Sequence, residues 1–221
     1  MDIKKVEEFI KSDTYDYSKK KAYSLIFVNL GVALVVILAL VAAEMIVGLI
    51  VFAALLACYL VIIFCLNAKI TEENALTFLS HSITILMAAI GLNFALQAIL
   101  VWFEDFTLTD IFISLAIQII AFVVFVIVIP MAVKSNHYKK YSAIATISGL
   151  IGVVIVGVVT GLIKFNSSAA DIKSILLVGV FNFIIVIFTC VLAQMLIKWH
   201  YCRKYNIAAP NRANNKKTNK N

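Results

Sequence analysis

Long stretches of apolar residues alternate with short polar segments along most of the chain. The apolar stretches cover residues 24–66, 82–103, 109–131, 142–164 and 175–197. One transmembrane helix needs about 20 such residues, so the first stretch is about twice the required length. We therefore expect it to hold two helices, joined by a tight turn at Glu44, the only charged residue in that stretch.

This pattern predicts an all-α, polytopic membrane protein with six transmembrane helices arranged as three antiparallel hairpins. The expected spans are residues 24–43, 46–66, 82–103, 109–131, 142–164 and 175–197. Residues 23–198 would then form one transmembrane domain.

Polar segments precede and follow this domain. In residues 1–22, an apolar stripe made by Ile3, Val6, Phe9 and Ile10 predicts a short helix lying on the inner leaflet; the alternative is a solvated tail. Residues 199–221 are basic and end in an Asn/Lys-rich stretch with almost no apolar residues, so we expect a largely disordered tail.

Composition agrees with a membrane location. Of the 221 residues, 63% are hydrophobic and 14% are charged, whereas soluble domains have about 45–50% apolar and about 25% charged residues. The net charge of +7 favours a basic cytoplasmic face over a nucleic-acid partner, because no nucleic-acid-binding motif accompanies it. The partner that composition implies is the lipid bilayer.

The distribution of Lys and Arg predicts the orientation. With the N-terminus inside, the inner segments hold 6, 1, 3 and 7 basic residues, which is 17 in all, and the outer segments hold Lys164 and Lys173 alone. We therefore expect a multi-pass protein of the cell membrane with both termini in the cytoplasm.

Uncharged polar residues inside the expected spans are the first candidates for function, because such groups are costly in hydrocarbon unless a partner satisfies them. They are Asn29, Asn93, Gln97, Gln118, Asn182 and Gln194. They would either line a path for a polar substrate or form hydrogen bonds between helices. In an antiparallel hairpin, two residues at equal distance from the turn lie at the same depth. With the turn near residue 106, Asn93 is level with Gln118 and Gln97 is level with Ser114. We therefore expect these four residues to form a polar ladder across one hairpin.

Two further patterns suggest contacts or ligands. Span 142–164 carries glycines that permit close helix packing, either inside the protein or between two copies: Gly149, Gly152, Gly157 and Gly161. Candidate metal ligands near the cytoplasmic face are His81, His137, His200 and Cys202, although their spacing matches no known site. We expect no cofactor.

Three functions remain open. The sequence favours a non-enzymatic membrane subunit or accessory protein that packs against a partner membrane protein or a second copy. The alternative is a small permease or channel-like subunit for a polar or amphiphilic solute. A membrane-embedded enzyme comes third, because the chain has no catalytic motif and the expected spans have almost no ionisable residues.

Overall fold

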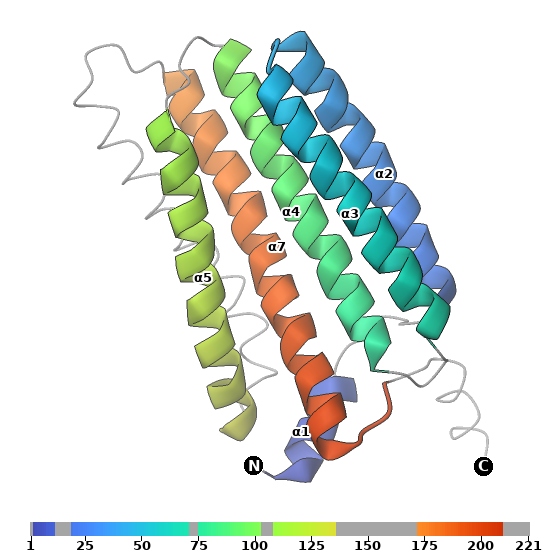
Figure 1. The fold of residues 1–221 in the computed structure, drawn as a ribbon. Coiled ribbons are helices and arrows are strands. Elements are labelled where there is room, and N and C mark those ends of the chain that lie inside the picture. Colours follow the sequence, from blue (N-terminus) through green and yellow to red (C-terminus); the bar gives the residue numbers. More distant parts are fainter. Residues whose placement is uncertain (1, 12–18, 71–74, 103–107, 136–171, 210–221) are drawn as a thin grey trace.

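The computed structural model describes residues 2–11, 19–70, 75–102, 108–135 and 172–209. Within these ranges the chain forms six α-helices: α1 (Ile3–Lys11), α2 (Lys19–Ala42), α3 (Ile46–Lys69), α4 (Leu76–Trp102), α5 (Leu108–Lys134) and α7 (Ile172–Tyr205). Figure 1 shows the five long helices side by side, with the short α1 at one end of the bundle. The expected span at 142–164 with its four glycines, His137 and the tail from residue 210 lie outside the described residues.

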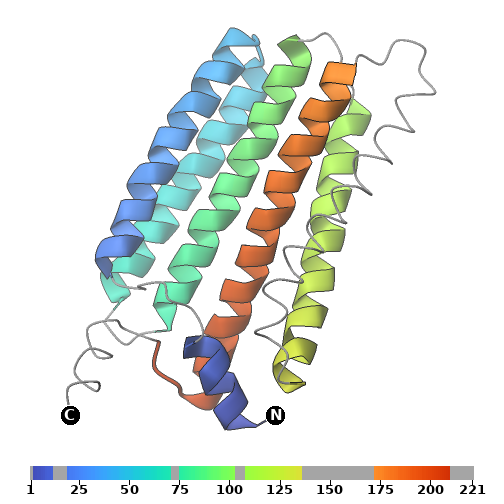
Figure 2. The ribbon, with the colours of Figure 1, turned by 180° about the vertical axis from the view of Figure 1, so that it is seen from behind.

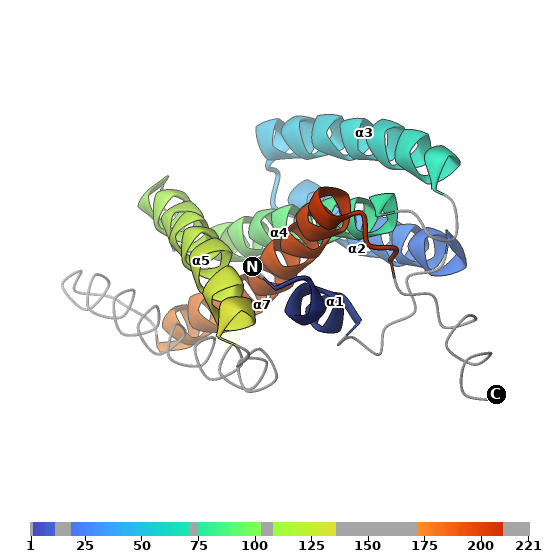
Figure 3. The ribbon, with the colours of Figure 1, turned by 90° about the horizontal axis from the view of Figure 1, so that it is seen from below.

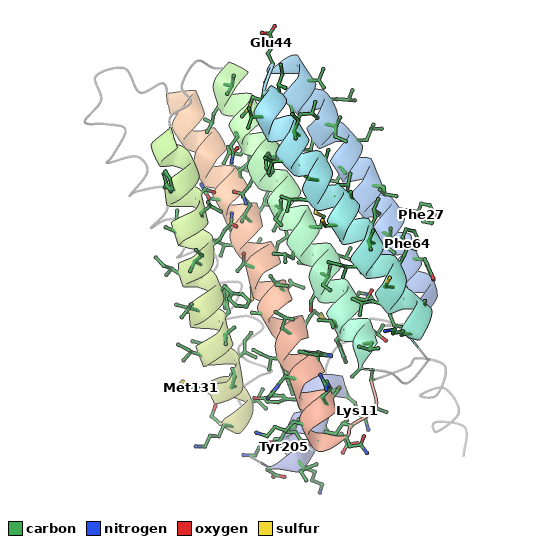
Figure 4. All side chains as sticks on the ribbon, viewed as in Figure 1. Lys11, Phe27, Glu44, Phe64, Met131 and Tyr205 are labelled. Atoms are coloured by element: carbon green, nitrogen blue, oxygen red, sulfur yellow. The ribbon has the colours of Figure 1, made fainter. Side chains whose placement is uncertain are left out.

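Each of the five long helices contains a segment long and apolar enough to cross a membrane. These segments are Tyr23–Ala42, Ile46–Lys69, Leu76–Val101, Ser114–Lys134 and Gly179–Tyr205. Large apolar side chains on the outside of the bundle are exposed, for example Phe27 at 73% and Phe64 at 52% (Figure 4). Such a surface requires lipid around it, so the chain is a polytopic membrane protein.

The turn expected at Glu44 is confirmed. Helix α2 ends at Ala42 and α3 begins at Ile46, and Glu44 has a φ angle of 56°. The amide of Met45 donates to the carbonyl of Leu40, and the amide of Glu44 donates to that of Val41. This pair of bonds is a Schellman motif, which closes the end of a helix and reverses the chain without a proline.

Helix α4 lies in the middle of the bundle. It packs against α2 and α3 on one side and against α7 on the other, while α5 packs against α7. The views from the front and from behind show the same order, with α7 between α4 and α5 (Figures 1 and 2). Helices α4 and α5 are consecutive in the described chain, yet each of them packs mainly against α7, a helix that comes later in the sequence.

Helix α1 packs on the end of the helix bundle. Its residues Val6, Phe9 and Ile10 are buried in a cluster with residues of α4, α5 and α7, whereas Ile3 is 57% exposed. Lys5 Nζ also donates to the carbonyl of Lys134, at the end of α5, at 3.2 Å. The apolar face that we expected to rest on lipid therefore covers the end of the bundle (Figure 3).

Candidate functional site

Polar side chains from three helices meet between α4, α5 and α7. The hydroxyl oxygen of Ser114 lies 2.9 Å from Asn93 Oδ1 and 2.9 Å from Asn182 Oδ1. The three residues are 4%, 8% and 1% exposed, respectively. We call this group the Asn–Ser–Asn cluster; it joins one residue from each of three helices, α4, α5 and α7.

The hydrogen bonds of the cluster follow from the donors available. A serine hydroxyl carries one hydrogen, so it donates to one of the two amide groups. Asn93 Nδ2 donates to the carbonyl of Ala89 at 3.1 Å, and this bond turns Asn93 Oδ1 toward Ser114. Rotation of the Asn182 amide would present its nitrogen to the Ser114 oxygen, so both asparagines can bond to the same hydroxyl.

The structure brings together two members of the expected ladder in a different register. Asn93 bonds to Ser114, whereas the hairpin numbering paired Asn93 with Gln118, one helical turn further along α5. The numbering assumed that α4 and α5 are direct neighbours, but α7 lies between them and supplies Asn182. Gln97, one turn from Asn93 on α4, takes no part in the hydrogen bonds that join Asn93, Ser114 and Asn182.

Gln118 does not form the hydrogen bond with Asn93 that the hairpin numbering predicted. Its Nε2 atom is buried and has no hydrogen-bond partner among the described residues. An amide nitrogen buried in this way costs free energy unless a water molecule or a polar group satisfies it. Gln118 lies one turn from Ser114 on α5, so this donor is close to the Asn–Ser–Asn cluster.

A second set of buried polar residues connects α2, α3 and α4. Asn29 Nδ2 donates to the carbonyl of Thr84 at 2.9 Å, and the Tyr59 hydroxyl donates to Thr84 Oγ1 at 3.4 Å. One turn away, Ser80 Oγ donates to Asn67 Oδ1 at 2.7 Å. Sequence reasoning named Asn29 but missed the others; the i,i+4 spacing of Ser80 and Thr84 on one helix face was the signal that could have found them.

The candidate metal ligands do not gather into a site within the described ranges. His81 is buried, with Nδ1 2.7 Å from the carbonyl of Thr77 on its own helix. Cys202 is buried in the cluster beneath α1, and His200 is exposed. No group of three or more His, Cys, Asp or Glu residues comes together in the part of the chain that the structure describes.

The Asn–Ser–Asn cluster has a limited chemistry. Amides and a hydroxyl donate and accept hydrogen bonds without changing charge at physiological pH. Such groups join helices to each other, or bind water or a neutral polar solute.

No protein-family model, curated protein sequence or solved structure compared with the chain matches it.

Proposed function

We propose that the chain is a non-enzymatic membrane subunit or accessory protein that acts by packing its helices against a partner membrane protein or a second copy. The observation that supports this most is the Asn–Ser–Asn cluster, in which buried polar groups bind each other across three helices. A permease presents polar groups to its solute, whereas a packing subunit uses them to fix its own helices.

The proposal includes six crossings of the cell membrane, with both termini in the cytoplasm. Helix α5 ends beside α1, and α7 begins at the opposite end of the bundle (Figure 1). A further crossing between residues 135 and 172 would connect them, in agreement with the expected span at 142–164. The basic residues of α1 and of the last turn of α7 support the proposal that this end faces the cytoplasm, because Lys and Arg are enriched on that side of membrane proteins.

Cysteine labelling tests this orientation. In a variant whose four native cysteines are replaced by alanine, Glu44→Cys should react with a membrane-impermeant thiol reagent added to intact cells. Asn206→Cys should react only after permeabilisation. Both positions are exposed, so the reverse pattern would overturn the orientation without contradicting the fold.

The same reagent tests the packing role. Ser114→Cys in the cysteine-free chain should stay unlabelled from both sides, because a satisfied cluster between packed helices excludes water. Glu44→Cys serves as the positive control. Rapid labelling of Ser114→Cys by a water-soluble reagent would show an aqueous path and would count against the proposal.

Association is the second requirement of this function. A single chain has a mass of 24.4 kDa. Native mass spectrometry of material cross-linked in the membrane before extraction should give a larger complex, containing a second copy or another membrane protein. A chain that remains monomeric after efficient cross-linking would contradict a packing role.

Gln118 favours the permease as a second candidate. Its buried Nε2 atom near Ser114, which has no hydrogen-bond partner among the described residues, could donate a hydrogen bond to a polar solute. A permease predicts that Gln118→Cys reacts with a soluble reagent and that a transported solute slows the reaction. The packing role predicts no reaction at either Gln118→Cys or Ser114→Cys.

A further inference from the structure

Basic side chains gather where α5 and α7 end, on either side of α1. Helix α5 ends at Lys134, and the last turn of α7 contains Arg203 and Lys204. All three side chains are exposed. The apolar segments of these helices that are long enough to cross a membrane end at Lys134 and Tyr205, so we expect the three cations at the border of the bilayer.

Hydrophobic packing brings the ends of α5 and α7 into one cluster. Val133 and Cys202 are buried in the same hydrophobic cluster, beneath α1. Lys134 and Arg203 directly follow these two residues in the sequence. Lys5 of α1 adds a fourth cation, because its Nζ lies 3.2 Å from the carbonyl of Lys134.

Aromatic rings support the cations of α7. The Arg203 guanidinium lies 5.4 Å from the ring centre of Trp199, and Lys204 Nζ lies 5.7 Å from that of Tyr205. Cation–π contacts of this kind restrain a long side chain while its charge stays available. Trp and Tyr are also the residues typical of the headgroup layer of a membrane.

The described acids leave these cations without a counter-ion. Glu7 is already paired with Lys11, at 2.6 Å on the same helix. Among the residues that the structure describes, no acidic side chain forms an ion pair with Lys134, Arg203 or Lys204. Within the described ranges, Lys134, Arg203 and Lys204 at the corner formed by α1, α5 and α7 therefore carry charges that no ion pair compensates.

We propose that this corner binds the headgroups of anionic phospholipids. Its depth at the membrane border brings the phosphates of the same leaflet within reach, and Arg and Lys are the residues that bind phosphate most readily. A lipid fits better than a soluble anion because the cations and their aromatic supports lie at the end of membrane-crossing helices. The site would also favour the docked position of α1, since Lys5 belongs to both.

Native mass spectrometry of the purified full chain tests the proposal. The probes are dioleoyl-phosphatidylglycerol, which is anionic, and dioleoyl-phosphatidylcholine, which is zwitterionic. Wild-type protein should retain phosphatidylglycerol in preference to phosphatidylcholine. Lys134→Gln should weaken the retention about fivefold, and the triple variant with Arg203→Gln and Lys204→Gln about 100-fold, because each cation near a charged surface contributes a factor of about five.

Lys69→Gln is the matched control. Lys69 is the last residue of α3 and lies at the same end of the bundle, but on the side away from α5 (Figure 3). Lys69→Gln should leave retention unchanged, and glycerol 3-phosphate at millimolar concentration should not displace the lipid. Equal losses for Lys69→Gln and Lys134→Gln would show a diffuse surface charge and overturn the site.

Two other outcomes would also overturn the proposal. Displacement by glycerol 3-phosphate would assign the corner to soluble phosphates. The second outcome is unchanged lipid retention in a triple variant that keeps the wild-type circular dichroism spectrum and melting temperature. It would show that these cations do not bind lipid and would point to an acidic protein partner instead. If the triple variant does not fold, Lys134→Gln alone decides: unchanged retention in this single variant would overturn the proposal.

Discussion

Two buried serines show how the role of a hydroxyl depends on its partner. Ser114 bonds to asparagines on two other helices, whereas Ser82 donates to the carbonyl of Phe78 on its own helix at 2.8 Å. Their exposures are similar, at 4% and 1%. Removal of the hydroxyl should therefore have different consequences at the two positions.

We predict that Ser114→Ala lowers the free energy of unfolding by about 1–3 kcal/mol, because it leaves a buried amide without its partner. Ser82→Ala should change it by less than about 0.5 kcal/mol, since the Phe78 carbonyl keeps its place in the helix. Denaturant titration in detergent micelles measures both values. Equal effects would mean that the hydroxyl of Ser114 has no special role in joining helices.

Glu44 makes the turn between α2 and α3 at a backbone cost. Its φ angle of 56° is unfavourable for a residue with a side chain, by roughly 1–2 kcal/mol. Glu44→Gly should raise the free energy of unfolding by about 0.5–1 kcal/mol, after allowing for the greater entropy of glycine in the unfolded chain.

Glu44→Ala separates the backbone effect from the loss of charge. It removes the carboxylate but keeps a Cβ atom, so it should give no such gain. If the alanine variant is as stable as the glycine variant in thermal melts, the strain is not located at this φ angle.

At the scale of single elements, α1 is the helix most dependent on tertiary contacts. It has nine residues, and isolated helices shorter than about 12–15 residues are marginal in water. The Glu7–Lys11 pair gives limited local support: the hydrogen bond from Lys11 lowers the pKa of the Glu7 carboxyl. This support is present at neutral pH and is lost as acid protonates Glu7. Burial of Val6, Phe9 and Ile10 must supply the remaining stability.

Phe9→Ala should therefore release α1 from the bundle. Phe9 is 4% exposed, and the Lys198 ammonium lies 4.9 Å from the centre of its ring. The loss of a buried phenylalanine costs about 3–5 kcal/mol. Only three residues of α1 are buried against the bundle, so we expect this cost to exceed the free energy of docking. Amide hydrogen exchange in residues 3–11 should rise sharply while the long helices keep their protection.

Ile3→Ala is the control for this experiment, because Ile3 lies on the same helix and is 57% exposed. Exchange in α1 should stay as in the wild type. Slow exchange in the Phe9 variant would contradict the docking of α1 through its apolar face.

Patterns local in sequence predicted the elements well. The 24–66 stretch indicated two helices and a turn at Glu44. Three of the four residues of the predicted stripe, Val6, Phe9 and Ile10, lie on the buried face of α1, whereas Ile3 is exposed. What α1 packs against was not predictable, because Tyr201 and Val133 of the same cluster are more than a hundred residues away. Hydropathy distinguishes apolar from polar faces, but lipid and protein satisfy an apolar face equally well.

At the scale of the whole molecule, the order of the helices was the part that sequence spacing did not reveal. The hairpin numbering brought Asn93 and Ser114 to one region of the bundle, where the structure joins them by a hydrogen bond. It chose the wrong pairs, because α7 lies between α4 and α5 and adds Asn182 as a third partner. Side-chain packing and a few polar contacts determine which apolar helices become neighbours. The distance of a residue from a turn in the sequence gives no information about either.

The central claim is that the Asn–Ser–Asn cluster joins helices across the bundle. A double-mutant cycle with Ser114→Ala and Asn182→Leu, measured by reversible unfolding in micelles, tests it most directly. Interhelical hydrogen bonds in membranes contribute about 0.6–2 kcal/mol, so the account predicts a coupling energy of about 1 kcal/mol between the two residues. Additive effects, with a coupling energy below about 0.3 kcal/mol, would show that α5 and α7 are held together without this bond and would contradict the account.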